Sequence, residues 1–413
     1  MMRKSIWIVL GLGLLMACSA KTEKIDYTKL SEEEVLAEAK KIAHETIIVD
    51  GHMDLPFRMY NLGNHLNGEV YDFINRQTEG NIDYVRAKEG GLDAPFMAIY
   101  IPASYQEKGG AKVLADTLIM MVERLVNTWP DKLALAKSPQ EIEENFKKGL
   151  LSLPMGIENG AAIEDDINNL QYFFDRGIRY MTLTHGKDNL IGDSSYDTAR
   201  TNNGLSDFGK KVVLEMNRLG MIVDVSHVDD KTFFDVAEVS KAPLVATHSS
   251  ARHFTPGFER NVSDEIIQKI AEKKGMVMIT FGGSFIDQGY AAAGDSIRAH
   301  IQEWLKTNNL TMQDSAAQAY IKAYRAQHAP TVHVSKIAEH IDHVVKLVGI
   351  DYVGLGSDFD GVGDSLPEGM KDASMYPNLI AELLKMGYSR EDIEKICHKN
   401  FFRVWNDILN AAG

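Results

Sequence analysis

Residues 47–56 read IIVDGHMDLP, a strand-like run that leads into polar residues. It opens with Ile-Ile-Val, an apolar, β-branched run that favours a buried strand. The run leads directly into His52 and Asp54, and a proline follows them. Because alternate residues of a strand point to the same side, His52 and Asp54 are placed to share one metal ion. A single His-x-Asp pair also occurs in polar turns. Whether this pair lies in a turn or in a metal site therefore depends on the residues that follow the other predicted strands.

Short apolar runs of this kind alternate with longer amphipathic segments along the chain. The predicted strands are 46–49, 94–101, 150–157, 178–183, 221–225, 244–246, 275–281 and 352–355. The predicted helices are 83–89, 110–128, 166–175, 206–219, 229–239, 263–273, 334–348, 375–386, 389–397 and 400–409. Eight strands alternating with helices predict an α/β protein with a (β/α)₈ (TIM) barrel. An open, doubly wound sheet is the alternative, but no glycine-rich phosphate loop follows any of the strands.

The domain organisation follows from the same alternation. The chain has 413 residues, of which 45% are hydrophobic and 25% charged, and this composition suits one large globular barrel. We expect residues 31–413 to form a single domain, opened by a helix that starts at Ser31. An insertion is expected at about 282–333, with helical stretches at 296–305 and 312–327. Since the loops that follow the strands of a barrel open on its catalytic face, the insertion should cover that face.

The N-terminus has the order of an export signal. Arg3 and Lys4 precede a short apolar run at 6–15, and Cys18 follows a small residue. This pattern predicts a signal peptide at 1–17, lipidation of Cys18 and a lipidated tether at 18–30. A plain signal peptide or a short membrane anchor is the alternative. The predicted location is therefore the cell envelope of a bacterium, as a lipoprotein held to a membrane by its lipid.

The cysteine count bears on disulfide bonds, and the net charge bears on binding partners. The second of the two cysteines is Cys397, so lipidation of Cys18 leaves no intramolecular disulfide. The net charge of −14 disfavours a nucleic-acid partner or direct binding to an anionic membrane surface.

Side chains that bind metals follow six of the eight predicted strands. They are His52 and Asp54 after the first strand, Glu158 after the third, His185 after the fourth, His227 after the fifth, His248 after the sixth and Asp358 after the eighth. All strands of a parallel barrel point the same way, so these side chains should meet at one mouth. Imidazoles and carboxylates suit Zn²⁺ or a similar cation, and the set is too large for one tetrahedral ion. Two ions that share a bridging carboxylate would use it fully.

The remaining histidines do not follow predicted strands together with other metal-binding residues. His340 and His343 lie three residues apart on a predicted amphipathic helix without the glutamate of a zinc-protease motif, which indicates a solvated helix face. The others are interpreted as structural: His44, His65, His253, His300, His328, His333 and His398.

Six short motifs together resemble the membrane (renal) dipeptidase family of zinc peptidases. They are DGHMDLP at 50–56, GIE at 156–158, LTH at 183–185, DVSH at 224–227, HSSA at 248–251 and GSDFDG at 356–361. They occur in the family's order and extend over about residues 45–405. The resemblance implies a barrel of the metal-dependent amidohydrolase type that holds two zinc ions.

The resemblance also assigns roles to the metal-binding residues. It implies that His52 and Asp54 hold one zinc ion, that His227 and His248 hold the other, and that Glu158 bridges them.

Three further residues receive roles in the same way. His185 is expected to contact the substrate and its tetrahedral intermediate, and Asp358 to shuttle the proton. Arg260 is similar to the arginine that binds the C-terminal carboxylate of the dipeptide, the alternative being a surface arginine beside a helix start. The implied activity is zinc-dependent hydrolysis of dipeptides, including those with a C-terminal D-residue, by a hydroxide that two metal ions activate. Members of the family are often dimeric, so a homodimer is a possible assembly.

The chain departs from the family pattern at two positions. Met53 stands where the family usually has Asn, and Asn159 stands where it usually has Gly. We expect Met53 to alter packing and Asn159 to narrow the pocket or change specificity, without loss of a ligand. Two other functions stay open. One is hydrolysis of a cyclic amide, lactone or β-lactam in the same barrel, and the other is peptide binding by a surface lipoprotein without catalysis.

Overall fold

A computed structural model describes residues 26–64 and 68–413 of the chain. The predicted signal peptide, Cys18, most of the predicted tether and His65 lie outside the described residues.

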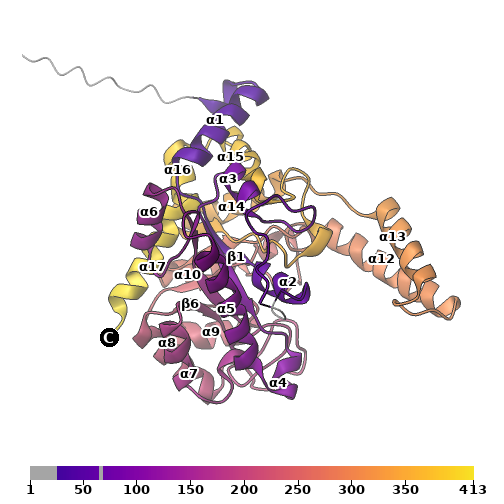
Figure 1. The fold of residues 1–413 in the computed structure, drawn as a ribbon, viewed down its shortest axis with the longest axis horizontal. Helices are drawn as coiled ribbons and strands as arrows, with labels where there is room; N and C mark the ends of the chain where they lie inside the picture. The colour runs from indigo at the N-terminus through magenta and orange to yellow at the C-terminus, as the bar shows by residue number, and fades with distance from the viewer. Residues whose placement is uncertain (1–25, 65–67) are drawn as a thin grey trace, which may run out of the picture.

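Eight parallel strands form the centre of the molecule (Figure 1). In order of their pairing they are β1 (Val49–Met53), β2 (Ala94–Tyr100), β5 (Met155–Glu158), β6 (Ile178–Thr182), β7 (Ile222–Asp224), β8 (Leu244–Ala246), β9 (Met276–Ile279) and β10 (Val353–Leu355). The last strand returns to the first, because the segment after β10 bridges to Met53 through Phe359. There the amide of Asp358 donates to the carbonyl of His52 at 3.0 Å. The sheet is therefore a nearly closed barrel, which confirms the predicted fold class.

Helices surround the strands in the expected alternation. Those near predicted positions are α1 (Glu32–Glu45), α3 (Tyr84–Gly90), α5 (Ala111–Thr128), α7 (Asn168–Asp175), α8 (Asp207–Leu219), α9 (Asp230–Val239), α10 (Asp264–Glu272), α14 (Ser335–Val348), α15 (Tyr376–Lys385), α16 (Arg390–Glu394) and α17 (Asn400–Ala411). Serine and aspartate caps explain their starts: Ser31 and Glu34 form a capping box, and Ser206 and Ser263 each accept a hydrogen bond from the first turn. A π-helical turn, Lys395–Lys399, joins α16 to α17.

Two strand predictions were wrong in their bounds. The first strand was predicted at 46–49 but runs over Val49–Met53, because the buried polar side chain of Asp50 finds partners on neighbouring elements. The predicted strand 150–157 is two strands, β4 (Leu151–Leu153) and β5, separated at Pro154, which has no N–H for a ladder. β4 pairs with β3 (Leu133–Leu135) in a separate two-stranded sheet that the sequence did not indicate.

Three helices were also missed: α2 (Leu55–Asn61), α4 (Ser104–Lys108) and α6 (Pro139–Lys147). The first and last have proline in their first turn, where its missing N–H has no intrahelical partner to lose. Pro56 is the second residue of α2, which begins two residues after the end of β1 and contributes Phe57 and Arg58 to the barrel mouth.

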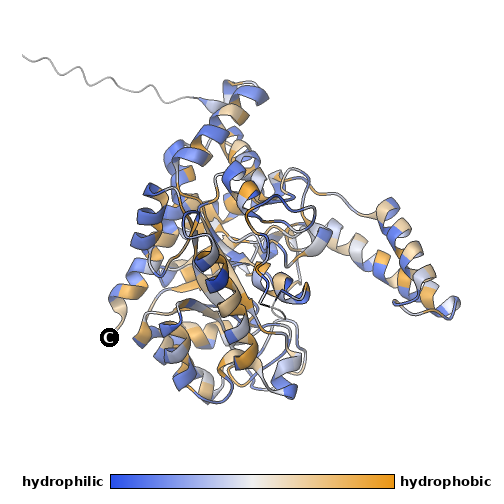
Figure 2. Cartoon of the chain, viewed as in Figure 1, coloured by the Kyte–Doolittle hydropathy of each residue, from blue (hydrophilic) through white to orange (hydrophobic). Residues whose placement is uncertain are grey.

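The floor of the barrel is closed by aromatic residues of the C-terminal helix α17. Phe401 and Trp405 pack against Phe96 of β2 and share a buried core cluster with Tyr180 of β6. Figure 2 shows the corresponding pattern, with apolar residues on the strands and the inner helix faces and polar residues outside. The closed floor leaves the opposite end, where the strands finish, as the open end of the barrel.

The predicted insertion forms a helical arm. After α11 (Gly283–Ile286), helices α12 (Gln288–Thr307) and α13 (Ser315–His328) project from the barrel as a hairpin (Figure 1). The arm has a small core of its own, formed by Ile301, Ala317 and Ile321.

The prediction of a solvated face for His340 was wrong. Its ring is fully buried, its Nδ1 accepts a hydrogen bond from the amide of Ala251 at 3.1 Å, and its Nε2 donates to the carbonyl of Ile286 at 2.9 Å. The ring can be buried because a backbone amide and a backbone carbonyl satisfy its two nitrogens. None of the described helices combines the length and the apolarity that a membrane crossing requires.

Candidate metal centre

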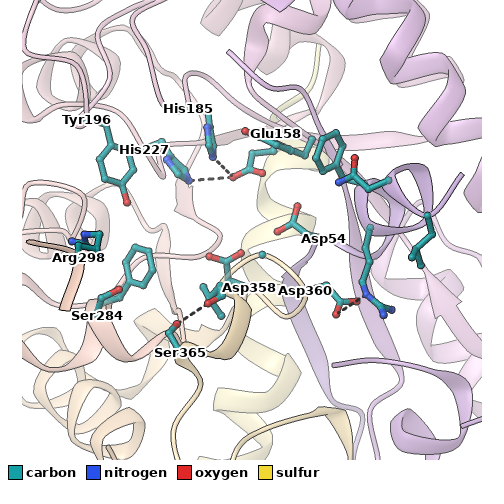
Figure 3. Close-up of a pocket in the computed structure, with 18 residues that line it drawn as sticks. Asp54, Glu158, His185, Tyr196, His227, Ser284, Arg298, Asp358, Asp360 and Ser365 are labelled. Carbon is teal, nitrogen blue, oxygen red and sulfur yellow. Dashed lines mark hydrogen bonds and ion pairs between the residues drawn. The ribbon is translucent and has the colours of Figure 1, made fainter. Parts of the chain in front are cut away.

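The seven predicted residues meet at the open end of the barrel. His52 lies on β1, Asp54 follows that strand, and Glu158 is the last residue of β5. The other four lie in the loops that follow the strands: His185 after β6, His227 after β7, His248 after β8 and Asp358 after β10. In Figure 3, His185 and His227 point toward Glu158, and Asp54 and Asp358 face the same space from the other side. Strand direction alone brings these residues together.

Glu158 occupies the middle of this cluster. Its Oε1 lies 3.1 Å from Nε2 of His227, 3.2 Å from Nε2 of His248 and 3.6 Å from Nε2 of His185. Its Oε2 faces the other way and lies 3.4 Å from Nε2 of His52. The two oxygens of one carboxylate thus face two different groups of imidazoles, as a bridging ligand would.

The spacing of these atoms suits metal ligation. An ion with ligands at about 2.0–2.2 Å places neighbouring tetrahedral donors roughly 3.3–3.6 Å apart. His227 and His248 bring their Nε2 atoms to 3.0 Å, and Asp54 Oδ2 lies 3.7 Å from His52 Nε2. His52 Nε2 and His227 Nδ1 are buried and make no hydrogen bond among the described residues. His52 Nε2, a buried nitrogen that faces the Glu158 carboxylate without a hydrogen-bond partner, fits a cation between the two.

The hydrogen bonds of His248 identify the nitrogen that is free. The hydroxyl of Thr247 donates its single hydrogen to Asp224 Oδ2 at 2.7 Å, and it lies 2.8 Å from His248 Nδ1. It must therefore accept from Nδ1–H, which leaves the lone pair of His248 on Nε2, toward Glu158. This is the tautomer that a metal ligand requires.

Several ligand sets overlap in the cluster. Ligand atoms lie within 4.8 Å of one another in three sets: His52, Glu158 and His248; Glu158, His185 and His227; and His52, Asp54 and Asp358. Each set shares a member with another, so the donors form one continuous cluster. These geometries support a metal centre.

The cluster carries a strong electrostatic field. Burial disfavours the charged imidazole of His52, but Glu158 and Asp54 outweigh it and raise its pKa to about 10. Burial and the charge of His52 lower the pKa of His248 to about 3. Burial and the neighbouring Glu158 raise the pKa of Asp358 to about 6, against the opposing effect of His52. Negative potential at this site attracts a cation of either kind, proton or metal.

Two buried aspartates that sequence reasoning missed hold the ligand loops. Asp50 Oδ1 accepts from the amide of His52, and Asp224 Oδ1 accepts from the amide of Ser226, each two residues on. Each carboxylate also accepts an amide hydrogen bond from a neighbouring strand end, Ser357 for Asp50 and Thr247 for Asp224. The sequence held a signal for both, because an aspartate precedes the ligand in DGH and in DVSH and makes an Asx turn.

Backbone conformation aims two of the side chains. His227 and Asp358 have φ of 70° and 63°, a left-handed region that residues other than glycine seldom adopt. Such conformations persist where the surrounding structure holds them, often at functional sites. Here the carbonyl of His227 accepts from the amide of Ser195, and the amide of Asp358 donates to His52.

A cavity of about 810 Å³ opens over the cluster. Its wall carries the cluster residues Asp54, Glu158, His185, His227 and Asp358, the aromatic residues Phe57, Tyr100, Tyr196 and Phe285, and the cations Arg58 and Arg298. Ser284, Phe285 and Arg298 come from the predicted insertion, so α11 and α12 form part of the wall. Sequence reasoning did not single out the two arginines or the two tyrosines, which have no motif of their own. The volume suits a small ligand.

Arg260 lies within the cluster and not on the surface. Its side chain is buried, with Nη1 donating to Ser249 Oγ at 2.7 Å and Nη2 donating to the carbonyl of His248 at 2.8 Å. Nη2 is also 3.0 Å from Nε2 of His227, and the guanidinium lies over the ring of Phe285. The surface alternative for Arg260 is therefore wrong, while its predicted contact with a substrate carboxylate stays a prediction.

The two departures from the family pattern face away from the cavity. Met53 is fully buried in the main hydrophobic core. Asn159 has φ of 81°, and its side chain bonds to Ile101, Gln106, Ala161 and Asn189. A glycine adopts this φ freely, and the four hydrogen bonds stabilise asparagine there instead. Asn159 is absent from the cavity wall, so it does not narrow the pocket directly.

Comparison with known proteins bears on this centre. A family model described as membrane dipeptidase, peptidase family M19, matches residues 36–413. An uncharacterised dipeptidase of Schizosaccharomyces pombe is 30% identical over 370 residues, which are 87% of this chain and 80% of that protein.

Solved structures give the same picture. The crystal structure of a probable dipeptidase, PvdM, from Pseudomonas aeruginosa is 25% identical, with a TM-score of 0.77 over 92% of this chain and all of that one. A metallopeptidase from Rhodobacter sphaeroides, solved with a phosphinate mimic of the dipeptide L-Ala-D-Ala, is 26% identical. Its TM-score is 0.69, over 88% of this chain and 99% of that one.

Proposed function

The chain belongs to the membrane dipeptidase family of metallopeptidases, and from this membership we propose a zinc dipeptidase that uses two ions and accepts dipeptides with a C-terminal D-residue. Family membership makes it a hydrolase of small peptides. The proposal consists of the number and identity of the metal ions, the roles of individual residues and the acceptance of a C-terminal D-residue. The observation that carries it is the position of Glu158, whose two oxygens face His52 on one side and His227 and His248 on the other.

His52 and Asp54 would hold one zinc ion and His227 and His248 the other, with Glu158 between them. Zinc supplies Lewis acidity at such a site, which makes water more acidic and polarises a carbonyl oxygen. The tautomer of His248 and the orphaned Nε2 of His52 support this assignment.

Asp358 is the proposed proton shuttle. It lines the cavity beside Asp54, and its left-handed backbone aims the carboxylate at the space in front of Glu158 (Figure 3). There it accepts a proton from the attacking water and delivers it to the leaving amine, as a general base and then a general acid.

His185 and Arg260 would bind the substrate. His185 lines the cavity with its side chain 23% exposed, so its imidazole is free to donate to the oxygen that becomes negative during attack. Arg260 is a buried cation at the edge of the cluster, and a guanidinium pairs well with a terminal carboxylate. Recognition of the scissile carbonyl of the first residue together with the free carboxylate of the next residue favours dipeptides over longer chains.

The proposed acceptance of a C-terminal D-residue is supported by a relative. The similar protein from Rhodobacter sphaeroides was solved with a mimic of L-Ala-D-Ala. Dipeptides of this kind are plausible substrates for an enzyme that we propose to be exported, anchored through lipid on Cys18 and located in a bacterial cell envelope. A homodimer is the assembly that the family resemblance favours.

A panel of L-L and L-D dipeptides, assayed with and without a chelator, tests the activity. We expect hydrolysis that stops on chelation and returns with Zn²⁺. Absence of metal-dependent hydrolysis across the whole panel would overturn the proposal. Cyclic amides, lactones and β-lactams belong in the same panel, because hydrolysis of these alone would favour the alternative substrate class.

The Asp358→Asn variant tests the proton shuttle. We expect loss of turnover with unchanged zinc content, because the amide keeps the size of the side chain but holds no exchangeable acidic proton. Metal analysis and dipeptide turnover are measured on the same preparation. Loss of metal from this variant would show that Asp358 is a ligand instead.

A further inference from the structure

A second group of metal-binding side chains lies outside the barrel mouth. His253 lies in the short 3₁₀ helix Arg252–Phe254, Asp264 is the first residue of α10, and His343 lies on α14. One ligand atom from each lies within 4.8 Å of the other two. We call these three residues the outer histidine cluster, and it shares no residue with the metal centre described above.

The geometry of the outer histidine cluster goes beyond a surface ion pair. His343 Nε2 lies 2.7 Å from Asp264 Oδ1, which by itself would be an ordinary pair. The ring of His253, however, stacks on the ring of His343 at 4.4 Å and 20°, and one of its nitrogens lies within 4.8 Å of the ligand atoms of His343 and Asp264. Two imidazoles and one carboxylate form a donor set for borderline divalent cations.

Neighbouring contacts hold the three donors in place. His340, one turn before His343 on α14, accepts from the amide of Ala251, two residues before His253. Arg252 pairs with Asp230 and donates to the carbonyl of Asn261, which holds the two ends of the segment 252–261 together. Because these bonds fix the backbone on both sides, little ordering remains for an ion to impose.

We propose that the outer histidine cluster is a second, separate site for a divalent transition metal ion such as Zn²⁺, open to water for its remaining ligands. Asp264 keeps 45% of its side chain exposed, and His343 keeps 17%. The ion joins α14 to both ends of the segment that carries Arg260, because His253 precedes Arg260 and Asp264 follows it. Binding therefore stabilises this segment and its attachment to α14.

Equilibrium dialysis against Zn²⁺, followed by measurement of zinc per chain, tests the site. The wild-type protein should retain one ion more than His253→Ala, His343→Ala or Asp264→Asn. His328→Ala serves as the matched control, because His328 is an exposed histidine on the arm, and this variant should bind as the wild type does. Melting curves in chelator, unchanged between the variants, show that the fold is intact.

The comparison between variants separates this site from the active centre. In a Glu158→Gln background the inner centre loses ligation, yet His343→Ala should still remove one further ion. The zinc-dependent rise in melting temperature should shrink in His253→Ala but not in His328→Ala. Equal zinc content in the wild type and in both histidine variants would overturn the inference, whatever the dipeptide assays show.

Discussion

Thr247 determines which nitrogen of His248 faces the metal centre. Its hydroxyl donates a hydrogen bond to Asp224 and accepts one from His248 Nδ1. Replacing Thr247 with Val keeps the shape of the side chain but removes this acceptor, so the tautomer is no longer held. We expect zinc affinity to fall about 10- to 100-fold, as for other partners of metal-bound histidines. Dialysis against graded chelator concentrations measures the change.

Thr280→Val is the matched control for that substitution. Thr280 is also buried at the end of a barrel strand, but its hydroxyl makes no hydrogen bond among the described residues. We expect its zinc affinity to equal that of the wild type. Equal loss in both variants would mean that Thr247 acts through packing and not through the proton.

His340 makes stability depend on pH. Burial lowers the pKa of this imidazole to about 4, while the unfolded chain protonates it near 6.5. The folded state therefore binds fewer protons, and the stability contributed by the neutral ring is present above pH 6.5 and is lost as the pH falls toward 4. Between pH 7 and pH 5 the loss should be about 2 kcal/mol.

The His340→Gln variant isolates this effect, since glutamine has a donor and an acceptor but no charge to gain. Denaturant unfolding at pH 7 and at pH 5 should show a smaller acid loss for the variant than for the wild type. His398, whose pKa burial also lowers to about 4, is present in both proteins and cancels. Identical acid losses would assign the pH dependence to other groups.

At the scale of elements, the arm α12–α13 should behave as a unit separate from the barrel. Its small core of Ile301, Ala317 and Ile321 is not continuous with the main core. Ile301→Ala should cost about 2–5 kcal/mol of local stability. We expect faster amide hydrogen exchange across residues 288–328 and unchanged exchange in the barrel strands.

Ile337→Ala is the control for the arm. Ile337 is fully buried on α14 and belongs to the main core, so its truncation should speed exchange in the barrel itself. Uniform exchange changes in both variants would show that arm and barrel unfold together.

The Ile301→Ala variant should also have a higher KM for dipeptides, because Arg298 and Phe285 of the insertion line the cavity and the substitution loosens the arm.

At the scale of the whole molecule, metal removal should destabilise the barrel. The cluster gathers the carboxylates of Asp54, Glu158 and Asp358 in a buried space, and an ion there would tie together the ends of strands from opposite sides. Chelation should therefore lower the melting temperature of the wild type. In Glu158→Gln this decrease in melting temperature should be smaller. If the wild type melted at the same temperature with and without chelator, that would contradict a bound ion.

Much of this architecture followed from local pattern. The eight strand runs, most of the barrel helices and the metal-binding residues after the strands could be predicted, because strand and helix periods are local and parallel strands end at one face. Where a local pattern has two physical explanations, prediction was wrong. Pro56 and Pro154 are examples, since Pro56 lies in the first turn of the missed helix α2, whereas Pro154 separates β4 from β5, which were predicted as one strand.

The barrel and the metal-binding character of its mouth could be inferred from residue type and strand direction, which are enough to bring His52, Asp54, Glu158, His227 and His248 together. Contacts between distant segments became known only from the folded chain. Folding buried His340 between two backbone groups, gave Asp224 and Thr247 control of a tautomer, and brought His253, Asp264 and His343 together. These contacts join residues that no local period relates, so they exist only once the chain has folded.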